Sequence, residues 1–265
     1  MQAIPITLAI DVLNLSKKYG DVVAVDNISF KVKQGSVFAF LGPNGAGKST
    51  TIKMLTTLLV PTNGTVTLNG FDVAKKSNEV RKNFGIVFQD PSLDDDLTAY
   101  ENMELHGVLY KVDNMKERIE QLLTFVELWD RKNSPVKTFS GGMKRRLEIA
   151  RGLMHHPKIL FLDEPTLGLD PQTRNHIWNY ISKMNREDGT TIFFTTHYME
   201  EAEKVADEIV IIDQGKIIAQ GTSTELKAKT KTNSLEDAFI DLTGHDIRPE
   251  EAPKNARMRA WHGRR

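Results

Sequence analysis

A glycine-rich segment that lies between an apolar run and a helix-compatible run constrains this chain more than any other feature. It reads Gly42-Pro43-Asn44-Gly45-Ala46-Gly47-Lys48-Ser49-Thr50, after the apolar run 37–41 and before the run 51–55. Glycines let backbone N–H groups converge on phosphate oxygens, and the following helix directs the positive end of its dipole toward the anion. The order of strand, loop and helix therefore predicts a triphosphate-binding loop, with Lys48 reaching the β- and γ-phosphates and Ser49 as a ligand of Mg²⁺.

Length and composition exclude several classes of protein. The 265 residues suit one large α/β domain or two small lobes. Lys and Arg total 35, as do Asp and Glu, so no net field favours nucleic acid as the main partner. No apolar run approaches the roughly 18 residues of a membrane span, and residues 1–5 lack the basic start of a secretion signal. Cysteine is absent, which excludes disulfides and thiolate metal sites. We expect a soluble intracellular protein.

Strand-like and helical segments alternate along most of the chain. Short β-rich runs predict strands at 8–15, 22–25, 28–32, 65–68 and 84–88. The middle is helical from 98 to about 129, beginning with a capping box at Thr98 and Glu101, and a helix follows Ser140-Gly141-Gly142. Alternation then returns, with strands at 159–162, 191–195, 209–213 and 216–219 and helices at 171–184 and 198–206. This order predicts an α/β fold with a mostly parallel sheet covered on both faces.

The apolar strand 159–162 ends in two carboxylates, Asp163 and Glu164. A buried strand places its last residues at the carboxyl edge of the sheet, where doubly wound folds bind their ligands. Asp163 is then placed to hold Mg²⁺, and Glu164 to polarise an attacking water or accept its proton. Alone, the pair would be an ordinary acidic turn. Beside a phosphate loop, it predicts a catalytic site.

Further motifs follow in an order that resembles the ATP-binding cassette of ABC transporters. Phe139-Ser140-Gly141-Gly142-Met143 lies before the acidic pair, and Gly168-Leu169-Asp170 and His197 lie after it. The resemblance covers residues 8–244. It implies a P-loop NTPase fold of the ABC type, with a mostly parallel core sheet, an N-terminal antiparallel β subdomain and an inserted helical lobe at about 90–155. The expected domain is 1–244, followed by a basic, flexible tail at 245–265.

The resemblance assigns roles to residues outside the loop. Tyr19 matches the aromatic residue that stacks on adenine, with a turn tyrosine as the alternative. Gln89 matches the residue that senses Mg²⁺ and the attacking water, with a surface amide as the alternative. Ser140, Gly141 and Gly142 match the element that contacts the γ-phosphate of ATP on the opposite subunit. A helix N-terminus suits that contact, and a serine N-cap is compatible with it.

Two positions near the end of the cassette also match. Asp170 corresponds to the loop that crosses the dimer interface, but before Pro171 it is equally an N-cap. His197 corresponds to the switch histidine that holds the γ-phosphate and orients the water, where a lone histidine is more often structural. The resemblance thus implies catalysis by Lys48, Gln89, Glu164 and His197. The implied magnesium ligands are Ser49, Gln89 and Asp163.

The signature element departs from the commonest pattern of the family. Phe139 and Met143 stand where leucine and glutamine are usual, and methionine cannot make the hydrogen bonds of an amide. With Lys144-Arg145-Arg146 after it, the element is similar to ATPase subunits of daunorubicin-type drug-resistance exporters. The segments 235–239 and 242–244 add to that likeness. The basic triplet is equally explained as a solvated helix face.

The resemblance implies an ATP- and Mg²⁺-dependent ATPase subunit of an ABC transporter, of the drug-exporter type. Two copies would sandwich two ATP molecules head to tail and drive a separate membrane permease, docked at 89–97 and the helical lobe. No nucleic acid partner is expected. The chain would lie in the cytoplasm, on the inner face of the membrane. The alternatives are a solute importer, a lipid or polysaccharide exporter, and an ABC ATPase that acts on ribosomes or DNA.

Overall fold

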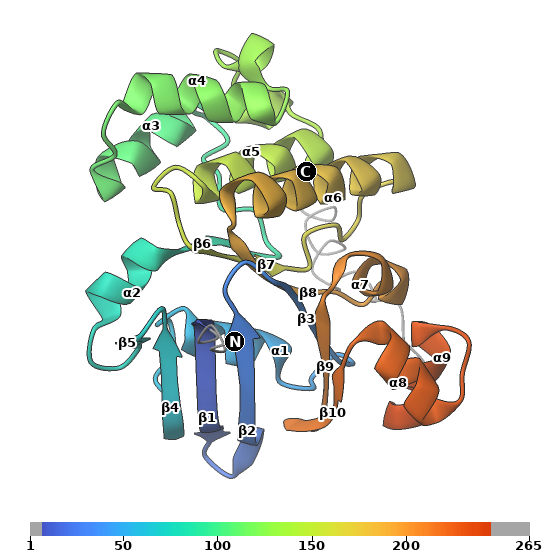
Figure 1. Ribbon diagram of the computed structural model, residues 1–265. Helices are drawn as coiled ribbons and strands as arrows, with labels where there is room; N and C mark the ends of the chain where they lie inside the picture. Colours follow the sequence, from blue (N-terminus) through green and yellow to red (C-terminus); the bar gives the residue numbers. More distant parts are fainter. Residues whose placement is uncertain (1–6, 245–265) are drawn as a thin grey trace, which may run out of the picture.

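The computed structural model describes residues 7–244, which form an α/β fold with two sheets (Figure 1). The smaller sheet is antiparallel, in the order β2-β1-β4-β5. Its strands are β1 (Leu8–Tyr19), β2 (Val22–Lys33), β4 (Asn63–Leu68) and β5 (Phe71–Asp72). The larger sheet has the order β10-β9-β3-β8-β7-β6, and only β10 is antiparallel to its neighbour. Its strands are β3 (Val37–Leu41), β6 (Phe84–Val87), β7 (Ile159–Asp163), β8 (Thr191–Thr195), β9 (Glu208–Asp213) and β10 (Lys216–Gly221).

The two faces of the larger sheet pack into two separate cores. Along β3, the side chains of Val37, Ala39 and Leu41 join a core made with the helices, whereas those of Phe38 and Phe40 join a core with the smaller sheet. This alternation follows from the two-residue period of a strand. All five residues of β3, β7 and β8 are buried. The prediction of a mostly parallel sheet covered on both faces is confirmed.

Stacked aromatic rings join the two sheets. Phe30 of β2 lies with its ring centroid 5.6 Å from that of Phe38 and 6.2 Å from that of Phe193. Phe38 and Phe193 are themselves 5.5 Å apart on neighbouring strands. Such offset contacts stabilise a core beyond the burial of apolar area. They fix the β1–β2 hairpin against the sheet that carries the phosphate loop.

The helices of the middle segment lie on the side of the larger sheet away from the smaller one (Figure 1). They follow β6 and precede β7, as expected for an inserted helical lobe. The helices of the described residues are α1 (Lys48–Leu55), α2 (Ser77–Asn83), α3 (Ala99–Tyr110), α4 (Met115–Phe125), α5 (Gly141–Gly152), α6 (Pro171–Asp188), α7 (Met199–Val205), α8 (Ser223–Thr230) and α9 (Leu235–Thr243), with short 3₁₀ turns η1 (Trp129–Arg131) and η2 (Val136–Thr138).

The boundaries of the helical segment are partly as predicted. Thr98 and Glu101 form the expected capping box at the start of α3. The segment predicted to be helical from 98 to about 129 holds two helices: α3 ends at Tyr110, its C-cap Lys111 has the left-handed conformation (φ 54°), and a new helix begins at Met115. Within residues 7–244, no helix combines the length and the hydropathy that crossing a membrane requires. The predicted tail at 245–265 lies outside the described residues.

Helices α2, α8 and α9 are not predicted from the sequence, and β2 is one strand where two are predicted. Val80 is the buried residue of α2, and Leu226 that of α8. Helices with so little apolar surface leave a weak periodic signal. Helix α8 has a local signal in the capping box of Thr222 and Glu225, whereas no side chain caps α2.

Candidate active site

The N-terminus of α1 forms one wall of the candidate site. Its N-cap, Gly47, has φ 106°, and no side chain caps the helix. A Cβ atom on Gly47 would lie 2.6 Å from the carbonyl oxygen of Ala24, so only glycine fits. Lys48 is buried, and its Nζ donates hydrogen bonds to the carbonyl oxygens of Gly42 (2.7 Å) and Pro43 (3.2 Å). The backbone N–H groups of this turn are therefore placed for an anion.

The structure brings this loop together with residues from two other strand ends. They enclose a small pocket of about 200 Å³. Gln89 follows β6, and Asp163 and Glu164 lie at the end of β7. Because β3, β6 and β7 are parallel, the segments that follow them meet at one edge of the sheet. The pocket is lined by Ala24, Pro43, Asn44, Gly45, Gly47, Lys48, Ser49, Thr50, Gln89, Asp163 and Glu164.

Asp163 is a buried carboxylate with a specific partner. Its Oδ1 accepts a hydrogen bond of 2.6 Å from the hydroxyl of Thr195. Burial raises the pKa of the Asp163 carboxyl, while the contacts with Thr195, Lys48 and Ser49 lower it. No group of three or more His, Cys, Asp or Glu residues within 7–244 forms a metal cage. Ser49, Gln89 and Asp163 instead offer a few hard oxygen donors, which fits Mg²⁺ that takes further ligands from phosphate and water.

Glu164 is held in an unusual backbone conformation. Its φ is 50°, in the left-handed region, which costs a non-glycine residue about 1–2 kcal/mol. The backbone N–H of Glu164 donates a hydrogen bond of 3.0 Å to the hydroxyl of Thr195. The Glu164 carboxylate accepts hydrogen bonds from His197, at 2.8 Å from Nδ1 and 3.3 Å from the backbone nitrogen. The two predicted catalytic residues, from the ends of β7 and β8, are thus in direct contact.

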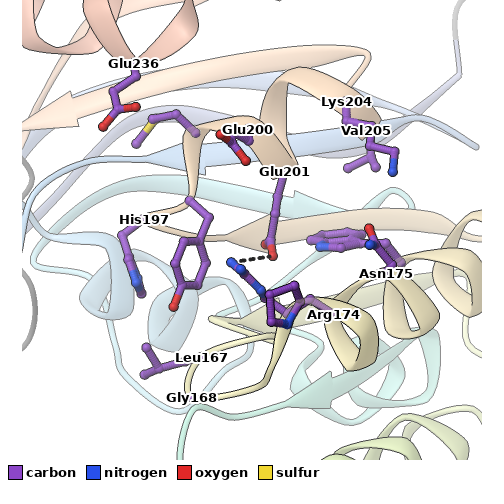
Figure 2. A pocket seen from close by; sticks show the side chains of 14 residues that line it. Leu167, Gly168, Arg174, Asn175, His197, Glu200, Glu201, Lys204, Val205 and Glu236 are labelled. Carbon is purple, nitrogen blue, oxygen red and sulfur yellow. Dashed lines mark ion pairs between the residues drawn. The ribbon is translucent and has the colours of Figure 1, made fainter.

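A second cavity lies behind His197, between the loop after β7 and helices α6, α7 and α9 (Figure 2). Glu201 projects into it beside Arg174, at 4.0 Å. The buried Glu201 carboxylate also accepts hydrogen bonds from the hydroxyls of Thr166 (2.8 Å) and Thr196 (3.4 Å). Glu201 therefore braces the chain just after Glu164 and just before His197. Sequence reasoning missed it, because nothing local distinguishes it from its neighbour Glu200.

Ser140, Gly141 and Gly142, the signature residues, lie apart from the phosphate pocket. Ser140 is the N-cap of α5, and its hydroxyl accepts a hydrogen bond of 3.3 Å from the backbone of Met143. Gly141 is exposed, and a Cβ atom on Gly142 would lie 2.6 Å from Cγ2 of Thr173. None of these three residues lines the phosphate pocket of its own chain.

Tyr19 and Asp170 are also outside the pocket lining, as are Gly42, Ala46 and His197, of which His197 lines the second cavity. Tyr19 is half-exposed at the end of β1, with Nζ of Lys17 at 5.3 Å from its ring. Asp170 is the N-cap of α6, and its carboxylate accepts hydrogen bonds from the backbone (3.0 Å) and hydroxyl (2.6 Å) of Thr173. The N-cap interpretation of Asp170 is therefore confirmed, and its position in an interface stays a prediction.

The family model described as "ABC transporter" matches residues 25–167, which contain the phosphate loop, the signature element and the acidic pair. The chain belongs to the ABC transporter family. The linearmycin resistance ATP-binding protein LnrL of Bacillus subtilis is 46% identical over 87% of this chain and 73% of its own length. The daunorubicin/doxorubicin resistance ATP-binding protein DrrA of Streptomyces peucetius is 44% identical, over 86% of this chain and 70% of its own length.

Solved structures agree with this assignment. An ATP-binding subunit of an ABC transporter superposes with a TM-score of 0.81 at 30% identity, covering 88% of this chain and 99% of that one. A dimeric ATP-binding cassette in a post-hydrolysis state, bound to ADP and Pi, superposes with a TM-score of 0.73 at 30% identity, covering 80% of this chain and 98% of that one. This ABC protein binds ATP and is an ATPase.

Proposed function

We propose that this ABC ATPase energises a drug-type exporter, working as a head-to-tail dimer that drives a separate membrane permease. The similarity to two drug-resistance ATP-binding proteins over most of the chain supports the choice of exporter. The signature variant with Met143 points in the same direction. We place the chain at the inner face of the cell membrane, held there by the permease.

The contact between Glu164 and His197 carries the proposed chemistry. Water attacks the γ-phosphorus, the bond to the β,γ-bridging oxygen breaks, and ADP leaves with that oxygen. Glu164 accepts the proton that the water loses. His197 holds the carboxylate in position through Nδ1 and the γ-phosphate through its other nitrogen. The buried setting strengthens these interactions, because little water competes for them.

The phosphates are held by the loop and by Lys48. On binding, the Lys48 ammonium exchanges the carbonyls of Gly42 and Pro43 for phosphate oxygens, and the uncapped turn of α1 donates its N–H groups. Ser49, Gln89 and Asp163 would hold Mg²⁺, which supplies charge neutralisation on the phosphates when bound. Tyr19 would stack on the adenine, since its ring is accessible at the end of the hairpin.

The second chain is needed to close the site. The α5 N-terminus and the phosphate pocket belong to different parts of one molecule, and the solved cassette bound to ADP and Pi is dimeric. We place Ser140, Gly141 and Gly142 of one chain against the γ-phosphate bound by the other, with Asp170 at the interface between the chains. Loss of the γ-phosphate removes this bridge, so the dimer opens after hydrolysis.

The permease would dock on the helical lobe. Leu105, Val108 and Leu109 recur on one face of α3 and are 60%, 64% and 73% exposed. An apolar stripe of this kind is typical of a protein interface. It lies in the lobe connected to the phosphate pocket through the segment after Gln89, so motion at the ATP site reaches it.

Substitution of the general base tests the proposal. In Glu164→Gln, the amide cannot accept a proton, so hydrolysis should fall by about 100- to 10,000-fold. ATP binding should persist, and size exclusion with Mg²⁺ and ATP should show a stable dimer. The matched control is Glu200→Gln, the neighbour of Glu201 in α7. Rapid hydrolysis by Glu164→Gln, with no dimer in ATP, would contradict the assigned role.

Identification of the membrane partner tests the choice of exporter. The tagged Glu164→Gln chain is purified from membranes in ATP, and the proteins bound to it are identified by mass spectrometry. We expect a permease without a solute-binding protein. A solute-binding protein in the complex would indicate an importer, and a ribosome would contradict transport.

A further inference from the structure

Three charged residues of α5 hold the chain segment that follows β6. Arg145 donates hydrogen bonds to the carbonyl oxygens of Phe88 (2.6 Å) and Gln89 (3.0 Å). Glu148 accepts a hydrogen bond of 2.8 Å from the backbone nitrogen of Ser92. Arg151 donates to the carbonyl oxygen of Ser92 at 2.7 Å and also contacts its hydroxyl. Helix α5 therefore grips residues 88–92 through their backbone.

Arg145 and Glu148 also pair with each other, in a buried setting. Their side chains are 7% and 2% exposed, and Nη1 of Arg145 lies 3.1 Å from Oε2 of Glu148. Burial raises the pKa of Glu148 and lowers that of Arg145, so each charge is costly without its partner. The interpretation of Lys144-Arg145-Arg146 as a solvated face is therefore wrong for Arg145.

A buried ion pair is a poor way to gain stability. Its desolvation cost can exceed the attraction, and apolar side chains of similar volume often stabilise a fold as well or better. What the pair adds is geometry, because the planar guanidinium holds two successive carbonyl groups in one orientation. The pair fixes where Gln89 lies relative to α5.

The two ends of this connection serve different ATP sites in the proposed dimer. Gln89 lines the phosphate pocket of its own chain. Helix α5 begins at Ser140, which faces the ATP bound by the other chain in the proposed arrangement. If ATP displaces the Gln89 backbone, these contacts would carry the displacement to α5, and its N-terminus would carry it to the opposite site.

We propose that Arg145 and Glu148 are positioning residues that couple the two ATP sites: they lock the Gln89 segment of one site to the helix that closes the other. This inference rests on the head-to-tail dimer of the proposed function. It predicts that ATP at one site favours closure of the second through a connection inside each chain. Neither residue touches the reacting atoms.

The test replaces both charges at once, because a single substitution leaves a buried unpaired charge and destabilises the fold. The variant is Arg145→Met with Glu148→Leu. The control is Arg146→Met with Glu127→Leu, which removes an ion pair of the same helix (3.3 Å) that joins it to the turn after α4. Circular dichroism and thermal unfolding establish that both variants are folded.

The first readout is the dependence of hydrolysis on ATP concentration. Two coupled sites give a Hill coefficient approaching about 2, and independent sites give about 1. We expect the coefficient to fall toward 1 in the Arg145/Glu148 variant and to stay at the parent value in the control. A folded Arg145/Glu148 variant with the parent coefficient would overturn the proposal, as would an equal fall in the control.

The second readout does not depend on hydrolysis or on a dimer. Amide hydrogen exchange is measured on monomers, checked by sedimentation, with and without Mg²⁺ and the ATP analogue AMP-PNP. In the parent, the analogue should slow exchange both at 88–92 and in the first turn of α5. In the Arg145/Glu148 variant it should slow exchange only at 88–92. A persisting response of α5 in the variant, or no response of α5 in the parent, overturns the coupling. Failure of the proposed dimer would instead appear as a parent that hydrolyses ATP without dimerising.

Discussion

Helices α1 and α5 both begin at a glycine-rich turn, but the chain surrounds their N-termini differently. The turn of α1 has no side-chain cap, and residues from two further strand ends enclose it in a pocket. The turn of α5 is capped by Ser140, and Gly141 beside it is exposed. One N-terminus is thus built into a site, while the other is presented at the surface.

This difference supports the proposal that one chain supplies half of an ATPase site. An uncapped N-terminus inside a pocket binds phosphate with donors that are already in place. An N-terminus at the surface would need an anion carried by another molecule, which is the role that the proposed dimer gives to the second chain. Substitutions at the two turns should therefore have different effects.

Lys48→Ala should have the largest effect on the α1 side. The buried ammonium is the charged donor of the pocket, and loss of a charge-assisted hydrogen bond costs about 1.5–3 kcal/mol. ATP binding, measured with a fluorescent analogue, should weaken by about 10- to 100-fold, and hydrolysis should fall at least as far. Lys53→Ala, on the exposed side of the same helix, is the control. Unchanged ATP binding by Lys48→Ala would contradict the assignment of phosphate binding to the turn of α1.

Gly141→Asp should act on the α5 side only. The nearest atom to a Cβ there is Cδ2 of Leu169 at 3.8 Å, so the side chain fits, and an acid suits the first turn of a helix. Its charge would repel the γ-phosphate carried by the other chain. We expect single chains to bind ATP with the parent affinity, while the ATP-dependent dimer and hydrolysis are lost. The comparison would fail if nucleotide affinity fell with Gly141→Asp as it does with Lys48→Ala.

Lowering the pH should destabilise the helical lobe that carries α5, an effect smaller than those of the two substitutions. His106 of α3 packs 4.7 Å from Tyr110, which stacks at 4.0 Å on His155 after α5, and burial lowers the pKa of His106 to about 4. Its folded pKa lies below the unfolded value of 6.5, so stability is present above pH 6.5 and lost as pH falls toward 4.

The loss should amount to roughly 1–2 kcal/mol between pH 7 and 5, since a pKa difference of one between the folded and unfolded chain corresponds to about 1.4 kcal/mol and the group is partly exposed. Urea unfolding at the two pH values measures it. In His106→Phe, which keeps an aromatic ring, the loss should be smaller. Burial lowers the pKa of His155 as well, so some dependence should remain. Equal losses in the parent and the variant would remove His106 from the explanation.

The α1 side of the comparison was more predictable from sequence than the α5 side. The phosphate loop is contiguous, and β3, β7 and β8 are apolar throughout, so local patterns place the loop and Asp163 at one sheet edge. The capping box of α3 is equally local. The family resemblance adds His197, and the structure places it against Glu164.

What sequence reasoning missed depends on contacts between distant segments. The burial of Arg145 depends on its contacts with Phe88 and Gln89, which lie 57 and 56 residues earlier in the chain. No local sequence pattern encodes such contacts. Glu201 likewise joins two loops that meet only in the folded chain. Helices α2 and α8 bury too little apolar surface to leave a clear period.

The most direct measurement of the central claim, that each ATP site needs two chains, is complementation between Lys48→Ala and Gly141→Asp. Each variant alone should hydrolyse ATP at a small fraction of the parent rate. When the two are mixed, a mixed dimer contains one site that combines an intact Lys48 from one chain with an intact Gly141 from the other. We predict that hydrolysis by the mixture rises well above the sum of the separate rates. A mixture that stays at that sum would contradict the composite site.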